Sequence, residues 1–172
     1  MLSPDYIVGL TDGEGSFTAY IRPPKKEHGS KNYRIECHYY IKLREDDRSL
    51  LENVKNFFRT GRVVFQRENR TNHHHMYRFE VTNLHDLQNL IIPFFEKHKL
   101  QSKRIKDFEL FKKIVKAVLN KEHQTENGLR KIQQWKKKMH QYMGSPNTGN
   151  PYVRSRYRKS RVRLKNRTGN GK

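Results

Sequence analysis

The stretch SPDYIVGLTDGEGSF (residues 3–17) decides how this chain is interpreted. Ser3, followed by a proline, is a typical helix start, so the pattern predicts a helix that runs to about Gly13. Asp12 and Glu14 then stand at the C-terminal end of that helix. The helix macrodipole is negative there, which disfavours carboxylates unless a cation compensates. These two acids are therefore either solvated or lie beside a positive charge.

The charge of the chain points to a polyanionic partner. Its 172 residues carry a net charge of +20, which is most simply explained by binding to nucleic acid. The sequence shows no long apolar run and no secretory signal pattern, so we expect no membrane partner. The single cysteine, Cys37, excludes an internal disulfide and indicates an intracellular, reducing location, either a bacterial cytoplasm or an organelle. Its place in an alternating apolar pattern predicts a buried side chain rather than a catalytic thiol.

A shift in composition divides the chain into two parts. We expect one folded domain over residues 1–143 and a basic tail over residues 144–172. From Pro151 onward the tail has nine Lys or Arg residues and no acid. Such a segment is predicted to be flexible until it meets a polyanion.

Periodicity predicts a mixed α+β fold. Period-two alternation predicts four strands, at residues 16–22, 33–42, 61–68 and 76–81. Helical periodicity and caps predict five helices, at residues 4–13, 46–58, 84–95, 102–119 and 125–143. The helix–strand–strand unit occurs twice, so we expect an αββαββα order and a four-stranded antiparallel sheet with helices on one face.

The other face of that sheet is expected to be polar and to bind DNA. On the third strand, Val63 and Phe65 are expected to point toward the core. The outward side chains are long and of mixed type, which suits hydrogen bonding to base edges better than a purely basic surface would. An ordinary solvated face is the alternative. The candidate DNA-binding residues are Thr18, Tyr20, Arg22, Arg34, Glu36, His38, Tyr40, Lys42, Arg62, Gln66, Arg78 and Glu80.

The segment IVGLTDGEG (residues 7–15) resembles the LAGLIDADG motif of homing endonucleases and related maturases. In that family two such helices pack together at the centre of the molecule, and their acidic ends hold divalent metal over the DNA backbone. The resemblance implies that Glu14 is a catalytic metal ligand, aided by the backbone of Gly13. Hard oxygen ligands suit Mg²⁺, with Mn²⁺ or a non-cleaving Ca²⁺ complex as variants.

The chain contains one copy of the motif, and family members with one copy act as homodimers. The resemblance therefore implies a second copy of the chain as partner, a sheet doubled into a DNA-binding saddle, and a pseudo-palindromic target. It also implies a catalytic lysine at the start of a later helix, for which Lys103 is the best match and Lys99 the reserve. The expected dimer interface comprises Ile7, Gly9, Leu10 and Gly13.

The main hypothesis is a homodimeric, metal-dependent homing endonuclease of a mobile intron, which hydrolyses phosphodiester bonds at a long site in double-stranded DNA. The alternative is an intron RNA maturase, or a non-catalytic DNA- or RNA-binding protein of the same fold. The three histidines at residues 73–75 are expected at a hairpin tip, in contact with solvent or phosphate rather than with a metal.

Overall fold

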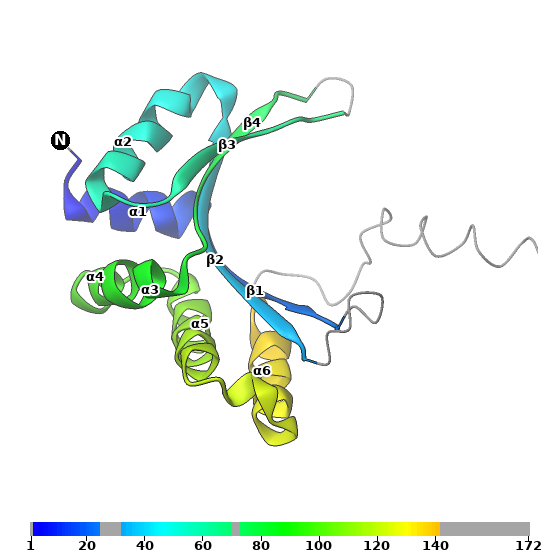
Figure 1. Ribbon diagram of the computed structural model, residues 1–172. Coiled ribbons are helices and arrows are strands. Elements are labelled where there is room, and N and C mark those ends of the chain that lie inside the picture. Colours follow the sequence, from blue (N-terminus) through cyan, green and yellow to red (C-terminus); the bar gives the residue numbers. More distant parts are fainter. Residues whose placement is uncertain (1, 25–31, 70–72, 142–172) are drawn as a thin grey trace, which may run out of the picture. The chain divides into compact units, whose positions relative to one another are not determined.

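The computed structural model describes residues 2–24, 32–69 and 73–141 (Figure 1). They belong almost entirely to one compact unit, Met1–His140, and the expected basic tail lies outside them. No helix in these ranges is long and apolar enough to cross a membrane. The elements, in order, are α1 (Pro4–Glu14), β1 (Gly15–Arg22), β2 (Arg34–Arg44), η2 (Glu45–Asp47), α2 (Arg48–Phe58), β3 (Arg62–Gln66), β4 (Met76–Val81), α3 (Leu84–Asp86), η3 (Leu87–Ile91), α4 (Ile92–Lys97), α5 (Arg104–Leu119), η4 (Glu122–Gln124) and α6 (Glu126–Lys138).

The four strands form one sheet in the order β1-β2-β4-β3, with every neighbouring pair antiparallel. The sheet is curved, and the helices pack on one of its faces (Figure 1). Among the described residues, no helix covers the middle of the other face. The predicted α+β fold class and the αββαββα order are therefore confirmed.

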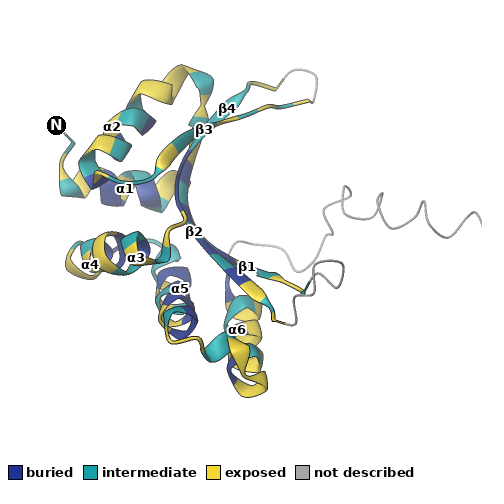
Figure 2. Cartoon of the chain, in the orientation of Figure 1, coloured by how far each residue is buried: buried dark blue, intermediate teal, exposed yellow. Residues whose placement is uncertain are grey.

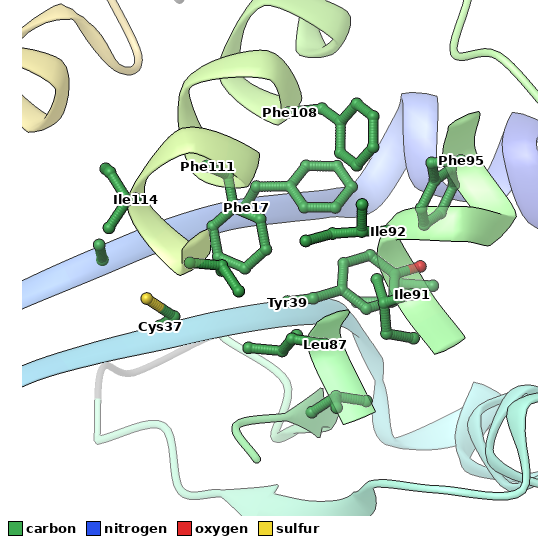
Figure 3. Packing of buried hydrophobic residues seen from close by; sticks show 14 of the residues in the cluster. Phe17, Cys37, Tyr39, Leu87, Ile91, Ile92, Phe95, Phe108, Phe111 and Ile114 are labelled. Atoms are coloured by element: carbon green, nitrogen blue, oxygen red, sulfur yellow. The ribbon is translucent and has the colours of Figure 1, made fainter. Parts of the chain in front are cut away.

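The core lies between the sheet and the helices, where the alternation of β2 directs its apolar side chains. Ile35, Cys37, Tyr39 and Ile41 are each at most 6% exposed, so the predicted burial of Cys37 is confirmed. Phe17 of β1 stacks on Tyr39, with ring centroids 5.0 Å apart. Phenylalanines of α4 and α5 surround these two rings (Figure 3), and the buried positions follow the helix-facing side of the strands (Figure 2).

The segment after Asn83 is less regular than predicted. The Asn83 side chain caps this segment by accepting hydrogen bonds from the backbone N–H groups of His85 and Asp86. The single helix expected over residues 84–95 contains one π turn, Leu87–Ile91. Because a proline ring clashes with the carbonyl four residues earlier, a widened turn before Pro93 allows the helix to continue.

The β3–β4 hairpin extends past α2, and this corrects one prediction (Figure 1). Phe65 lies on the helix side of the sheet, as expected, but it is 46% exposed because no helix reaches it. Its ring contacts the rings of His75 and Tyr77. His75 also accepts a hydrogen bond from the backbone N–H of Glu68. The described residues contain no group of three or more His, Cys, Asp or Glu side chains that could hold a metal ion.

The last described helix, α6, is shorter than predicted. The Thr125 hydroxyl caps it by accepting from the Gly128 backbone N–H, at 3.1 Å. The helix ends at Lys138 rather than near residue 143, because the chain turns at His140 with a φ of +60°. The backbone N–H and the imidazole of His140 both contact the buried carboxylate of Asp107 in α5, which fixes this turn.

Candidate active site and nucleic-acid interface

The acidic end of α1 is held firmly against the sheet. Thr11 is fully buried, and its hydroxyl shares a 2.8 Å hydrogen bond with the buried hydroxyl of Tyr39. Gly15 follows at the helix end, where a Cβ atom would lie 2.6–2.8 Å from Thr11. No other residue fits there without displacement, so this glycine allows the helix to pass directly into β1.

Asp12 connects α1 to the loop before α5. Its carboxylate accepts hydrogen bonds from the backbone N–H groups of Gln101 and Ser102, at 2.8 and 3.2 Å. The Ser102 hydroxyl donates a third bond, at 2.6 Å. Asp12 thus makes three hydrogen bonds within the fold and holds the end of α1 against the loop before α5.

A cation does lie at the C-terminal end of α1, and it is the guanidinium of Arg104. Its Nε donates to the carbonyl oxygen of Asp12 at 2.9 Å, and its Nη2 donates to that of Gly13 at 2.7 Å. These carbonyls have no partner within the helix, so the arginine both satisfies them and offsets the dipole. The family resemblance pointed to a lysine and therefore to the preceding residue, so Arg104 was not among the candidates.

Glu14 contrasts with its neighbours at this helix end. Its side chain is exposed, and within the described residues its carboxylate has no hydrogen bond or ion pair. Lys103, the expected catalytic lysine, is also exposed and stands immediately before α5. The structure therefore brings the start of α5 to the acidic end of α1, with Arg104 in contact and Lys103 beside it.

The polar face of the sheet carries the candidate DNA-binding residues at different depths. Five are exposed, five are half-buried and two are buried. The exposed ones are Tyr20, Arg22, Arg34, Lys42 and Arg62; the half-buried ones are Glu36, His38, Tyr40, Gln66 and Arg78; the buried ones are Thr18 and Glu80.

Thr18 is buried because α6 reaches the edge of the sheet. Lys136 extends from this helix and donates a hydrogen bond to the Thr18 hydroxyl at 3.0 Å. Burial lowers the pKa of the Lys136 ammonium, while the negative charge of Asp107 opposes that shift. Thr18 is only 5% exposed and already has a partner, so the expectation that it contacts DNA is corrected.

Glu80 is buried because basic side chains enclose it. It is 2% exposed, and one of its oxygens accepts from Nε and Nη2 of Arg62, at 2.9 and 2.7 Å. The other oxygen forms an ion pair with Arg78 and lies 3.8 Å from Nδ1 of His38. The expectation that Glu80 touches DNA directly is therefore corrected, because its own arginines cover it.

A second, more exposed carboxylate lies near the end of the β1–β2 pair. Glu36 accepts from Nε of Arg22 at 3.1 Å and pairs with Nη2 of Arg34 at 2.5 Å. Burial alone would raise the pKa of Glu36, but hydrogen bonds and charge from the two arginines hold it below its usual value. Arg22 also lies over the ring of Tyr20, 5.3 Å from the centroid.

In the part of the chain that the structure describes, nothing packs against one face of α1. Gly9 and Gly13 are both exposed, and a Cβ atom added at either would meet nothing within 4 Å. Tyr6 on the same helix is 46% exposed, and Leu10 is half-buried. Ile7, by contrast, is fully buried in the core of the domain, so its expected place at a dimer interface is corrected.

The sequence model of the family described as LAGLIDADG endonuclease matches residues 7–115. The chain belongs to the LAGLIDADG endonuclease family. The motif of this LAGLIDADG chain is the α1 stretch from Ile7 to Gly15, whose C-terminal end carries the site described above. The match also spans the sheet and most of α5, so it includes the other elements that form that site.

Curated relatives of this LAGLIDADG chain are named as intron-encoded. A probable intron-encoded endonuclease 2 of Neurospora crassa is 34% identical over 132 residues, which is 76% of this chain and 28% of the relative. A probable intron-encoded DNA endonuclease 1 of Mycosarcoma maydis is 30% identical over 109 residues, which is 63% of this chain and 35% of the relative. The chain thus spans about a third or less of these relatives.

Solved structures of LAGLIDADG proteins share the fold. The I-LtrWI homing endonuclease bound to target DNA is 30% identical with a TM-score of 0.70, over 81% of this chain and 45% of that one. I-SmaMI bound to uncleaved DNA in the presence of calcium ions is 26% identical with a TM-score of 0.72, over 92% of this chain and 50% of that one. This chain therefore corresponds to about half of each DNA-bound protein.

Proposed function

We propose that this chain acts as a homodimeric, Mg²⁺-dependent homing endonuclease, which cuts both strands of DNA at a long pseudo-palindromic site associated with a mobile intron. The observation that carries the proposal is the end of α1, where Glu14 is an exposed carboxylate without a partner among the described residues. Membership of the family supports the endonuclease class. Two solved structures of similar proteins, of which this chain covers about half, are bound to DNA.

The dimer is supported by the uncovered face of α1. Glycines cost helix stability, and no contact with the described residues requires a glycine at position 9 or 13. Four residues apart, they lie on one side of the helix and allow a second backbone to approach closely. A two-fold axis at this face would bring the two α1 ends together, with one Glu14 from each subunit. We propose Gly9, Leu10 and Gly13 as the interface.

A divalent cation fits the donors at this helix end. A carboxylate and a backbone carbonyl are hard oxygen ligands, and a carbonyl that accepts from Arg104 retains a second lone pair. The described residues of one chain offer no group of three ligating side chains, so further oxygens must come from the second subunit, from DNA phosphate or from water. Glu14 and the Gly13 carbonyl would hold the ion.

The chain's own residues would then orient the scissile phosphate. When bound, Mg²⁺ supplies Lewis acidity for the attacking water and the leaving oxygen. Glu14 provides the negative charge that localises the ion, and Arg104 fixes the helix end from which Glu14 extends. Lys103, exposed beside it, is proposed to offset the developing charge on the phosphate. The basic segment from Pro151 onward is proposed to add sequence-independent affinity.

A selection for cleaved DNA tests this function and reveals the target sequence in the same experiment. The full chain is incubated with a randomised duplex library and Mg²⁺, and cleaved molecules are recovered and sequenced. We expect one long consensus with approximate two-fold symmetry and breaks in both strands. Binding without Mg²⁺-dependent cleavage, or selective binding of intron RNA only, would contradict the endonuclease proposal and favour the binding-protein or maturase alternative.

The dimer is tested by filling the α1 face. Gly9→Leu should leave the isolated domain folded, because a Cβ atom there meets none of the described residues within 4 Å and leucine favours a helix. It should abolish dimerisation, measured by light scattering, together with double-strand cleavage. Lys113→Leu, an equally exposed helical position on α5, is the matched control and should remain dimeric. A Gly9→Leu protein that is still dimeric and active would show that this face is not the interface.

A further inference from the structure

Glu80 occupies an unusual place for an acid on a surface that binds polyanions. It stands in the centre of the sheet, opposite Tyr40 of β2 and opposite Arg62 of β3. Its side chain is 2% exposed, whereas that of Glu36 on the same face is 26% exposed. A carboxylate so deeply enclosed cannot be explained as a solvated surface charge.

The arginines that enclose Glu80 are held in different ways. Arg62 directs both Nε and Nη2 at one carboxylate oxygen, yet 68% of its side chain remains exposed. Arg78 contacts the other oxygen, is 24% exposed, and lies over the ring of Tyr40 at 5.1 Å. A guanidinium has five N–H groups, so each arginine keeps donors for another partner while its plane is fixed.

The cluster is not complete within the protein. Nδ1 of His38, Nε of Arg78 and the second carboxylate oxygen of Glu80 are buried without a hydrogen bond among the described residues. That oxygen does form an ion pair with Arg78, and it lies 3.8 Å from Nδ1 of His38. A buried polar group left unpaired costs about 1–3 kcal/mol, so the two buried nitrogens without a hydrogen bond, Nδ1 of His38 and Nε of Arg78, indicate groups arranged for a purpose other than stability.

Burying this ion pair is also a poor way to stabilise a sheet. Removing charges from water costs several kcal/mol per ion, and well-packed apolar side chains often stabilise a fold as well or better. An arginine free to move would instead turn toward the nearest phosphate. A guanidinium locked by a carboxylate presents its remaining donors in one direction, which is the requirement for bidentate bonding to O6 and N7 of guanine.

We infer that Glu80 is a positioning residue for base recognition: its buried carboxylate aims Arg62 and Arg78 at base edges and keeps them from neighbouring phosphates. The inference rests on the proposed function, in that the sheet face must bind duplex DNA. It assigns a specificity role to a residue that does not touch the DNA. It also predicts guanine preferences at the base pairs that Arg62 and Arg78 face.

The test compares two substitutions at one position. Glu80→Gln removes the charge but keeps the shape, and Glu80→Asp keeps the charge but shortens the side chain. A preferred duplex is first selected by wild-type protein in Ca²⁺, and affinities are then measured for it and for every single base-pair change. In both variants, the affinity ratio between the preferred duplex and a changed one should fall about tenfold at one or two positions per half-site. At the other positions the ratio should stay at the wild-type value.

Control substitutions separate the loss of a negative charge on the sheet face from the loss of arginine positioning by Glu80. Glu36→Gln removes the same charge from the same face, and it should tighten binding to all duplexes alike. Glu80→Gln should show the same uniform gain in affinity for all duplexes, in addition to its loss of base discrimination. Arg62→Gln should lose the base preference at the pair that Arg62 faces, and the double variant Glu80→Gln/Arg62→Gln should lose no more at that pair than either single variant. If a variant unfolds, which a thermal melt would show, Arg62→Gln and Arg78→Gln decide which base pairs are involved.

Three results would overturn the inference. Glu80→Asp with full wild-type discrimination would mean that charge alone matters. Glu80→Gln with an unchanged base profile would mean that the arginines are oriented without the carboxylate. Arg62→Gln and Arg78→Gln with uniform losses across all duplexes would make them phosphate contacts. Failure of the wild-type chain to select any duplex would instead overturn the proposed function, and the inference with it.

Discussion

Asp12 and Glu14 are both acids, two residues apart at the end of one helix, and they differ in almost every structural respect. Asp12 accepts three hydrogen bonds from the loop before α5 and is half-buried. Glu14 is exposed and has no partner in the described part of the chain. Residues two apart on a helix point about 200° away from each other, so the two carboxylates serve opposite sides of α1.

The difference shows that two acids of one motif can have separate roles, one structural and one chemical. One acid joins two elements about ninety residues apart in the sequence, and so fixes where the helix ends. The other uses that fixed end to present a charge outward. Arg104 links both roles, because its guanidinium bonds to the carbonyls of Asp12 and Gly13. Structural and chemical roles can therefore be separated by substitution.

The largest expected effect belongs to Glu14→Gln. The amide keeps the size of the side chain but is a much poorer ligand for a hard cation, so Mg²⁺-dependent cleavage of a selected duplex should fall about 10³-fold or more. The free energy of unfolding should change by less than about 0.5 kcal/mol, because no contact is lost. Duplex affinity in Ca²⁺ is measured in parallel. Normal cleavage by this variant would make Glu14 a solvated helix end and remove the proposed mechanism.

Asp12→Ala should show the reverse pattern. Three hydrogen bonds to one carboxylate disappear and two backbone N–H groups lose their acceptor, so the free energy of unfolding should fall by about 2–4 kcal/mol. Urea denaturation at one fixed protein concentration measures it, since a dimer's stability depends on concentration. Asp5→Ala, at the exposed start of the same helix, is the control and should cost less than about 1 kcal/mol. Equal losses for both variants would contradict the structural role given to Asp12.

Arg104→Gln is expected to have the smallest effect of the three substitutions, and it tests the residue that links the two acids. Loss of the guanidinium removes two bonds and a favourable charge at the helix end, which should cost about 1–2 kcal/mol of unfolding free energy. Arg104→Lys restores the charge but not both bonds, so it should recover part of that loss. The same urea experiment at low and high salt separates the two contributions, because salt weakens only the charge term. An unchanged stability in Arg104→Gln would mean that water replaces the guanidinium without cost.

The fold was largely predictable because its core follows short-range periodicity. Ile35, Cys37, Tyr39 and Ile41 alternate in the sequence, and a strand must place them on one side. The motif helix was equally readable, since Ser3 does accept a hydrogen bond from the Tyr6 backbone. Such features depend on neighbours within a few residues of one another.

The parts that were not predictable depend on distant partners. Alternation correctly puts Glu80 on the polar face, but only the register of β3 against β4 shows that Arg62 covers it. Phe65 has the right side but the wrong burial, because helix coverage depends on where α2 ends. The contact of Arg104 with the end of α1 likewise depends on the geometry between α1 and α5, which one sequence does not contain.

The buried thiol of Cys37 can report how often the core of this molecule opens. It is the chain's single cysteine, it is 1% exposed, and burial raises its pKa to about 12. A thiol reagent can therefore label the native chain only during moments when the helices part from the sheet, so the labelling rate records how often the core opens. A cysteine introduced elsewhere on the surface would be labelled first and alone, without any need to remove the native one.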